Sequence, residues 1–215
     1  MRIVLMGMPG VGKGTQAVRL RDALQVLHVS TGDILREAIQ AGSPLGKRVR
    51  EFLDSGSLVP DDLMAELITE RLSRSDASRG FILDGFPRTA EQVSILDRVL
   101  ETLTVKLDVV FLLSASEEEI VSRLSGRRIC PGCGEVYHVD NRPSGSAGVC
   151  DQCGSALVQR PDDTKSVILD RLEVYKNQTL PVVEVYRERG LLQEIDGSGD
   201  PSTIFERLRT AVGQS

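Results

Sequence analysis

Short apolar runs alternate along the chain with longer segments whose apolar residues recur at helical spacing. The runs are RIVLM (2–6), FIL (81–83), VVFLL (109–113) and LLQEI (191–195), with a weaker one at LHV (27–29). Such runs predict buried strands. Helical spacing predicts helices at about 13–24, 33–39, 45–54, 63–72, 91–103, 117–124, 166–189 and 203–212. Together these elements predict an α/β fold, a parallel five-stranded sheet flanked by helices on both faces.

One stretch interrupts this alternation. Between residues 126 and 163 the apolar periodicity disappears, and four cysteines and the polar segment PSGSAG take its place. We interpret this stretch as a small subdomain inserted into the α/β core.

Composition narrows the class of protein. The 215 residues are 40% hydrophobic and 27% charged, which is typical of a soluble globular domain. No apolar run reaches 18 residues, so we expect no membrane association and a cytoplasmic protein. A net charge of −5 and an aromatic content of 4% argue against nucleic acid as a partner.

The segment GMPGVGKGT (7–15) nearly matches the phosphate-binding pattern G-x-x-x-x-G-K-[ST]. Gly7, Gly12 and Lys13 fit, but Gly14 stands where a hydroxyl is expected, and the hydroxyl follows on Thr15. Because the segment joins a predicted strand to a predicted helix, its backbone N–H groups and Lys13 could surround an anion. The alternative is an ordinary glycine-rich turn. Without the usual hydroxyl, metal binding needs another explanation.

A second candidate site is the segment DGFPRTAEQ (84–92). Asp84 ends a predicted strand. A carboxylate at this place can orient Mg²⁺ or its waters. The alternative is that Asp84 only begins a simple turn. Arg88 lies near the same sheet edge, where α/β proteins bind ligands, and could hold a phosphate. Gln92 could pair with adenine, or could form a helix capping box with Thr89.

The four cysteines have the spacing C-x₂-C-x₁₆-C-x₂-C, at Cys130, Cys133, Cys150 and Cys153. This spacing predicts a zinc site, and the glycine after each pair suits the turn that such a site needs. An insert of fewer than 40 residues cannot bury a sufficient core, so the metal would be structural. Disulfides, or another thiophilic ion such as iron or cobalt, are the alternatives.

The motifs together resemble the adenylate kinase family, in its long bacterial form with a zinc-binding lid. Besides GMPGVGKGT and DGFPRTAEQ, they include STGDILR (30–36), GRR (126–128) and QRPDD (159–163), and the resemblance covers about residues 2–212. It implies a P-loop NTPase-type core in residues 1–29, 60–125 and 164–215, an AMP-binding segment in 30–59 and a lid in 126–163. In this family glycine is normal at position 14, and Mg²⁺ is held largely through water.

The resemblance also implies an activity, the reversible transfer of a phosphoryl group from MgATP to AMP, giving two ADP. That reaction serves adenine nucleotide homeostasis and AMP salvage, and the family suggests a monomer. An AMP phosphate oxygen is already ionised, so no general base is needed, and we regard His28 and His138 as structural or incidental. A UMP/CMP or GMP kinase, or a zinc-ribbon module without enzyme activity, are the rival functions.

Site residues carry over from the family position by position. The expected ATP-binding residues are Gly10, Val11, Gly12, Lys13, Gly14, Thr15, Arg123, Arg127, Val136, Tyr137 and Gly199. The expected AMP-binding residues are Thr31, Arg36, Ser57, Leu58, Val59, Gly85, Phe86, Pro87, Arg88, Gln92, Arg160 and Arg171. The expected catalytic residues are Lys13, Asp84, Arg88, Arg127, Arg160 and Arg171. Two segments depart from the usual sequence of the family: DGSGDP (196–201) around Gly199 and VDNRPSGSAG (139–148) in the lid. Thr31 is open between a helix cap and a base contact, and Asp162 and Asp163 between helix capping and a role in the site.

Overall fold

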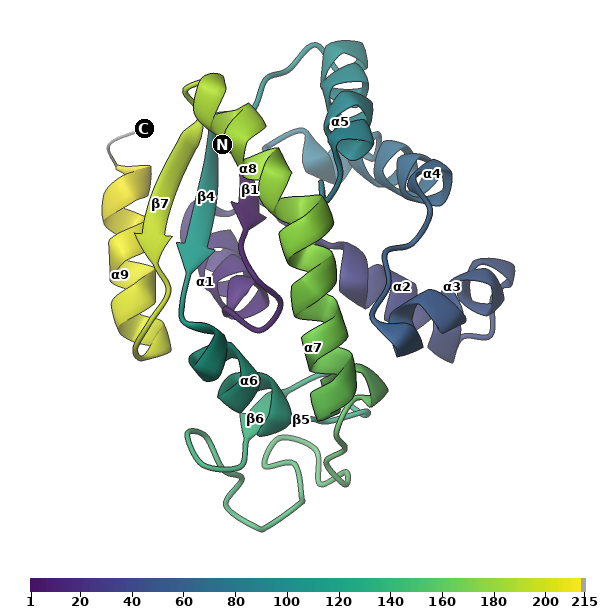
Figure 1. Cartoon of the computed structure of the whole chain (residues 1–215), viewed down its shortest axis with the longest axis vertical. Coiled ribbons are helices and arrows are strands. Elements are labelled where there is room, and N and C mark those ends of the chain that lie inside the picture. The colour runs from purple at the N-terminus through teal and green to yellow at the C-terminus, as the bar shows by residue number, and fades with distance from the viewer. Residues whose placement is uncertain (214–215) are drawn as a thin grey trace.

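The computed structural model describes residues 1–213, and its centre is a parallel sheet (Figure 1). Five strands form it in the order β2-β3-β1-β4-β7, and each pair of neighbours is parallel. Their bounds are β1 (Arg2–Met6), β2 (Leu27–Ser30), β3 (Phe81–Asp84), β4 (Val109–Ser114) and β7 (Leu192–Asp196). The expected five-stranded parallel sheet is therefore confirmed.

Helices occupy the segments between the strands. They are α1 (Lys13–Leu24), α2 (Thr31–Gln40), α3 (Pro44–Ser55), α4 (Asp61–Leu72), α5 (Ala90–Thr102), α6 (Glu117–Ser125), α7 (Lys165–Val174), α8 (Leu180–Glu188) and α9 (Pro201–Val212), with short 3₁₀ turns η1 (Ser75–Ala77) and η2 (Pro161–Asp163). The single helix expected at 166–189 is instead α7 and α8 joined by a π-helical segment, η3 (Tyr175–Thr179). Pro181 explains the break, because its ring nitrogen has no hydrogen to donate to the preceding turn.

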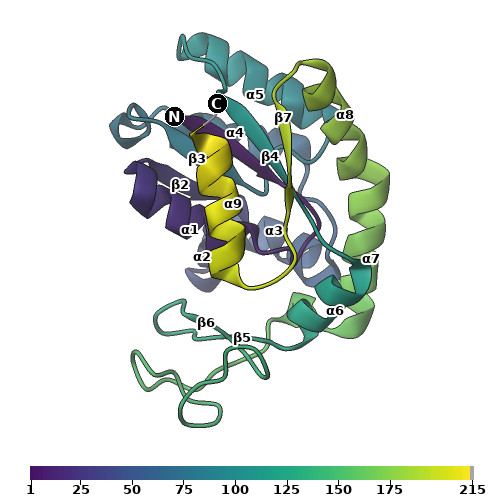
Figure 2. The same ribbon diagram turned by 90° about the vertical axis from the view of Figure 1, so that its left-hand side faces the viewer.

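The sheet separates two hydrophobic cores. Side chains alternate along β1, so Ile3 and Leu5 face one core while Val4 and Met6 face the other. Figure 2 shows α1 and α9 covering one face, with α5 and α8 on the opposite face. Burial on both sides explains why the strands have continuous apolar sequences.

Two segments project near the carboxyl ends of the strands (Figure 1). Helices α2 and α3 pack against each other and form one of them. The other contains the two-stranded antiparallel sheet of β5 (Arg127–Ile129) and β6 (Val136–His138) with the loops around it, which we call the lid (residues 126–163). Among the described residues, no helix is long and apolar enough to cross a membrane.

Candidate active site

A large cleft lies at the carboxyl ends of the strands, between the phosphate loop, α2, α7 and the lid. Its volume is about 1630 Å³, whereas a pocket for one drug-sized ligand has about 300–1,000 Å³. A smaller pocket adjoins it between α2, the end of α3 and β3. All the expected ATP-binding residues line the cleft, and the expected AMP-binding residues line one or both pockets, apart from Phe86. Phe86 is buried in the core beside α5.

The phosphate loop leads from β1 directly into α1. Gly10 and Gly12 have positive φ angles of 86° and 104°. Gly12 is the N-cap of α1, so no side chain of the cap residue occupies the end of the helix. This conformation is accessible to glycine at little cost. It places the unsatisfied amides of the first turn of α1 at the wall of the cleft. The loop therefore has the geometry of an anion site.

Lys13 brings a positive charge to the same loop. Its Nζ donates hydrogen bonds to the carbonyl oxygens of Gly7 at 2.7 Å and Met8 at 2.9 Å. Burial lowers the pKa of Lys13 to about 8, although the nearby Asp84 carboxylate acts in the opposite direction. Lys13 therefore remains largely charged at neutral pH and can reach an anion bound in the loop.

Asp84 ends β3 beside the phosphate loop. It pairs in register with Leu5 of β1, and its side chain is largely buried at the cleft. His28 of β2 also lines the cleft, with Nε2 3.7 Å from Asp84 Oδ2. The position of His28 near the site was not predicted, because its proximity to Asp84 depends on the parallel pairing of β2 with β3.

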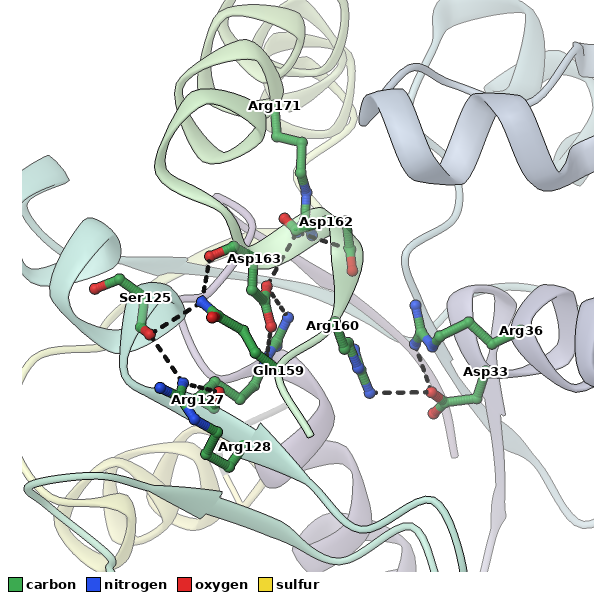
Figure 3. A network of polar contacts seen from close by, with 10 residues as sticks. All are labelled: Asp33, Arg36, Ser125, Arg127, Arg128, Gln159, Arg160, Asp162, Asp163 and Arg171. Carbon is green, nitrogen blue, oxygen red and sulfur yellow. Dashed lines mark hydrogen bonds and ion pairs between the residues drawn. The ribbon is translucent and has the colours of Figure 1, made fainter. Parts of the chain in front are cut away.

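Five of the described arginines line the cleft near the lid and α2, and we call them the arginine cluster: Arg36, Arg88, Arg127, Arg160 and Arg171. Figure 3 shows all of them except Arg88, with their carboxylates. Arg127 donates from Nε and Nη2 to Asp163 at 2.8 and 2.6 Å. Arg171 lies 2.9 Å from Asp162 and 3.5 Å from Asp163. The Asp162 and Asp163 side chains thus pair with arginines, and the N-cap of α7 is Thr164, so neither aspartate caps this helix.

Asp33 joins two more members of the cluster. Its Oδ1 lies 2.5 Å from Arg36 Nη2, in the same helix, and 3.9 Å from Arg160 Nη2, at the end of the lid (Figure 3). Burial acts to raise the pKa of Asp33, but the guanidinium of Arg36 outweighs it and lowers the pKa. The pairs of Asp162 and Asp163 with arginines were not predicted, because the partners lie well apart in sequence. Asp33 and Arg36 are only three residues apart in one helix, a spacing at which side chains commonly pair.

Arg88 differs from the other cluster arginines. Its Nε donates to the carbonyl oxygen of Gly85 at 2.7 Å, but no carboxylate within residues 1–213 comes within ion-pair distance. Burial, and then the charge of Arg171, lower the pKa of Arg88 to about 10. Burial likewise lowers the pKa of Arg160 to about 10, with Arg36 adding to the effect. Both guanidiniums stay charged, so this wall of the cleft favours an anion strongly.

Among the residues that line the smaller pocket are nine that were expected at the AMP site: Thr31, Arg36, Ser57, Leu58, Val59, Gly85, Arg88, Gln92 and Arg171. Thr31 is not the N-cap of α2. Ser30 takes that position and accepts from the backbone N–H of Asp33, while Thr31 donates to the carbonyl oxygen of Gly85 at 3.1 Å. The capping alternative for Thr31 is therefore wrong.

Gln92 is almost fully buried at the first turn of α5, and its amide is held from both ends. Nε2 donates to Asp61 at 2.7 Å, and Oε1 accepts from the backbone N–H of Arg88 at 2.8 Å. Thr89 caps the helix through the backbone N–H of Gln92, but the Gln92 side chain reaches Arg88 and not Thr89. The capping box is thus formed on one side only, and Asp61 fixes which end of the amide donates.

Arg123 connects the phosphate loop to the loop before α9. Its guanidinium donates to the carbonyl oxygens of Val11 at 3.0 Å and Gly199 at 3.2 Å, and pairs with Glu119. Gly199 lines the cleft with a φ angle of 94°. These contacts bring the expected ATP-binding residues of three separate segments to one side of the cleft.

The four cysteines converge in the lid. Their sulfur atoms all lie within 4.8 Å of one another, and the nearest pairs are 3.3 and 3.5 Å apart, too far for a disulfide. Gly134 and Gly154, which follow the two pairs, have φ angles of 77° and 75°, as expected. Four thiol sulfurs at this spacing match the donor set of a structural zinc site.

Comparisons with known proteins agree with this geometry. A family model described as "Adenylate kinase" matches residues 5–191. Proteins named adenylate kinase from Desulfitobacterium hafniense and Ruminiclostridium cellulolyticum are 47% and 45% identical, each over 99% of this chain and over 98% and 100% of their own lengths. Another from Methanothrix thermoacetophila is 46% identical, over 100% of this chain and 99% of its own. The chain therefore belongs to the adenylate kinase family.

Proposed function

We propose that the cleft binds ATP at the phosphate loop and AMP at the arginine cluster, with the two phosphate groups meeting between Lys13 and Arg88. The reaction is reversible phosphoryl transfer from ATP to AMP, which gives two ADP. The observation that carries the assignment of sites is the half-buried Arg88 guanidinium, which lines the same cleft as the anion-binding loop and has no carboxylate partner among the described residues. A protein of this family is an enzyme, so a zinc-ribbon module without activity is rejected as its function.

In the proposed ATP site, the backbone amides of residues 10–15 and Lys13 hold the phosphates. Arg123 supports the loops on either side of the adenine, and Val136, Tyr137 and Gly199 complete the wall. Adenylate kinases use Mg²⁺ with ATP, and when bound it neutralises charge on the β- and γ-phosphates. Asp84 is the carboxylate that fits a role in orienting the waters of this ion, because it borders the loop and lines the cleft.

In the proposed AMP site, Arg36, Arg88 and Arg171 hold the phosphate, with Arg160 from the lid. Arg88 supports this role most directly, because no carboxylate of residues 1–213 balances its charge. The loop of Ser57, Leu58 and Val59 borders the base, as does Thr31. Gln92 presents an amide whose donor and acceptor ends are fixed by Asp61 and Arg88, which supports selection of adenine over a pyrimidine.

The chemistry requires positioning and charge stabilisation. An ionised AMP phosphate oxygen attacks the γ-phosphorus in line, the bond from that phosphorus to the β–γ bridging oxygen breaks, and ADP leaves. Lys13, Arg88, Arg127, Arg160 and Arg171 stabilise the charge that spreads over the transferred group. Closure of the lid excludes water, which would otherwise accept the phosphoryl group.

We also propose that the lid (126–163) and the segment 30–59 move against the core formed by residues 1–29, 60–125 and 164–215. Cys130, Cys133, Cys150 and Cys153 hold a structural zinc ion that takes the place of a hydrophobic core in the lid. Four protein ligands leave no open position on the metal, so zinc takes no part in the transfer. The protein acts as a monomer.

The test couples ADP formation from ATP to each acceptor in turn: AMP, UMP, CMP and GMP. Turnover is expected with AMP above all others, and Lys13→Ala should lower it by orders of magnitude. Faster turnover with UMP, CMP or GMP would overturn the assignment of the acceptor. Full turnover of the Lys13→Ala variant would overturn the role of the phosphate loop.

A further inference from the structure

The hydroxyl group of Tyr137 lies next to one of the four cysteine sulfurs. Tyr137 belongs to β6 and is only 4% exposed, and its Oη lies 3.5 Å from Cys150 Sγ. The same oxygen accepts a hydrogen bond of 2.9 Å from the backbone N–H of Asp151. Because the oxygen accepts from this amide, its own hydrogen is free to point at the sulfur.

A second hydroxyl lies next to another cysteine of the cluster. Ser155 Oγ is 3.4 Å from Cys153 Sγ, on the exposed side of the site. Gly132, between the cysteines of the first pair, permits this approach. A Cβ at Gly132 would lie 2.7 Å from Ser155 Oγ and 3.3 Å from Cys153 Sγ.

A divalent cation and its four thiolate ligands together carry a net charge of −2. Sulfur atoms that carry such charge are stabilised by hydrogen-bond donors, above all where water cannot reach them. Cys150 is buried, with Tyr137 beside it, whereas Cys153 is exposed to water. A thiolate bound to metal has no hydrogen, so both hydroxyls must donate and both sulfurs accept.

We propose that Tyr137 and Ser155 donate hydrogen bonds to the metal-bound thiolates of Cys150 and Cys153, and that these bonds set how tightly the lid retains its metal. The proposal rests on the four-cysteine metal site proposed above. Tyr137 has the larger effect, because its sulfur partner is buried. Its backbone pairs with Arg128 of β5, so Tyr137 also connects the metal site to the strands that face the cleft.

The first experiment measures zinc content and then zinc affinity by competition with a chromogenic chelator under reducing conditions. Loss of an outer hydrogen bond to a metal ligand weakens binding by about 10–100-fold. We expect about a tenfold loss for Tyr137→Phe and a smaller loss for Ser155→Ala. Tyr186→Phe is the matched control, because the Tyr186 hydroxyl is buried, has no hydrogen-bond partner within residues 1–213 and lies outside the lid. It should bind zinc as the unaltered chain does.

A second measurement separates hydrogen bonding to the thiolate from simple packing. Thermal unfolding of Tyr137→Phe is compared with and without zinc. A role in packing or in holding Asp151 lowers both melting temperatures equally, whereas a bond to the thiolate lowers mainly that of the metal-bound form. With Co²⁺ in place of zinc, loss of the donor should also move the sulfur-to-metal charge-transfer band to longer wavelength.

The outcomes are distinct. Zinc affinity of Tyr137→Phe within twofold of the unaltered chain, or an unmoved cobalt band, overturns the role of Tyr137. An unchanged affinity in Ser155→Ala overturns that of Ser155. If the unaltered chain binds no metal and the Cys150→Ser variant melts at the same temperature, the metal site itself is wrong and this inference fails with it.

Discussion

Asp84 Oδ2 lies 3.3 Å from the position that a Cβ would occupy at Gly14. That distance is tighter than most contacts of a real Cβ, so the carboxylate would have to shift to admit any other residue. A residue with a hydroxyl side chain, which is usual at this place in phosphate loops, therefore requires the Asp84 carboxylate to move by a few tenths of an ångström. The loop is not a damaged version of the common motif, because the space next to Lys13 is taken by a carboxylate from β3.

We expect the Gly14→Ser variant to lose activity without losing stability. Serine favours a helix over glycine by about 0.5 kcal/mol, so the melting temperature should not fall. Displacing Asp84 should lower kcat by about 10- to 100-fold and raise the Mg²⁺ concentration needed for half-maximal rate. Steady-state kinetics across a Mg²⁺ titration measures both. Gly213→Ser, remote from the cleft, is the control, and a Gly14→Ser enzyme with normal kcat and Mg²⁺ dependence contradicts the crowding argument.

We expect Asp163→Asn to destabilise the protein and to reduce turnover. Asp163 is fully buried and accepts two hydrogen bonds from Arg127, with Arg171 at 3.5 Å. Removing the charge of one partner from a buried ion pair costs about 3 kcal/mol or more. Urea unfolding measures the loss. Glu70→Gln breaks the exposed pair with Arg74 and should leave the midpoint unchanged. Equal midpoints for both variants would contradict a special role for Asp163.

We expect kcat/KM for ATP to decline above about pH 8. Burial lowers the pKa of Lys13 to about 8, so the free enzyme loses this positive charge as the pH rises through that value and binds phosphate less well. A lysine without this shift would keep its charge to about pH 10. Lys13→Arg is the comparison, because an arginine stays charged in this range. Whatever the absolute rate of the variant, its kcat/KM for ATP should not decline near pH 8. A decline of the same form in both proteins would show that a group other than Lys13 causes the decline.

We expect Asp61→Asn to raise the KM for AMP about fivefold while the KM for ATP stays the same. The hydrogen bond from Gln92 Nε2 to residue 61, worth about 1 kcal/mol, then no longer fixes the orientation of the Gln92 amide. An asparagine at position 61 can pair with either the NH₂ group or the oxygen of that amide. Initial rates with each substrate varied in turn measure the two constants. Glu91→Gln, next to Gln92 in sequence but exposed in a pair with Arg98, should change neither constant. Equal shifts in both constants for Asp61→Asn would indicate a general disturbance and not a defect in reading AMP.

Much of the fold was readable from the sequence because its signals are local. The apolar runs of β1 and β4 are continuous because both faces of the sheet are covered, and the strands lie where those runs are. The glycines of the phosphate loop and the spacing of the cysteines are equally local. The π-helical turn before Pro181 was missed, because proline marks a disturbance of a helix without showing whether it bends, breaks or widens.

The chemical groups of the site can be read from the sequence alone: a phosphate loop, a set of arginines, a strand-end carboxylate and four cysteines. Which of these groups meet depends on the folded arrangement of the chain. Asp163 pairs with Arg127 across 36 residues, and Asp61 with Gln92 across 31. Contacts over such separations leave no pattern in a single sequence, because they depend on how strands are ordered and how the lid returns to α7. The same holds for Gly14 and Asp84, whose proximity follows from the pairing of β1 with β3.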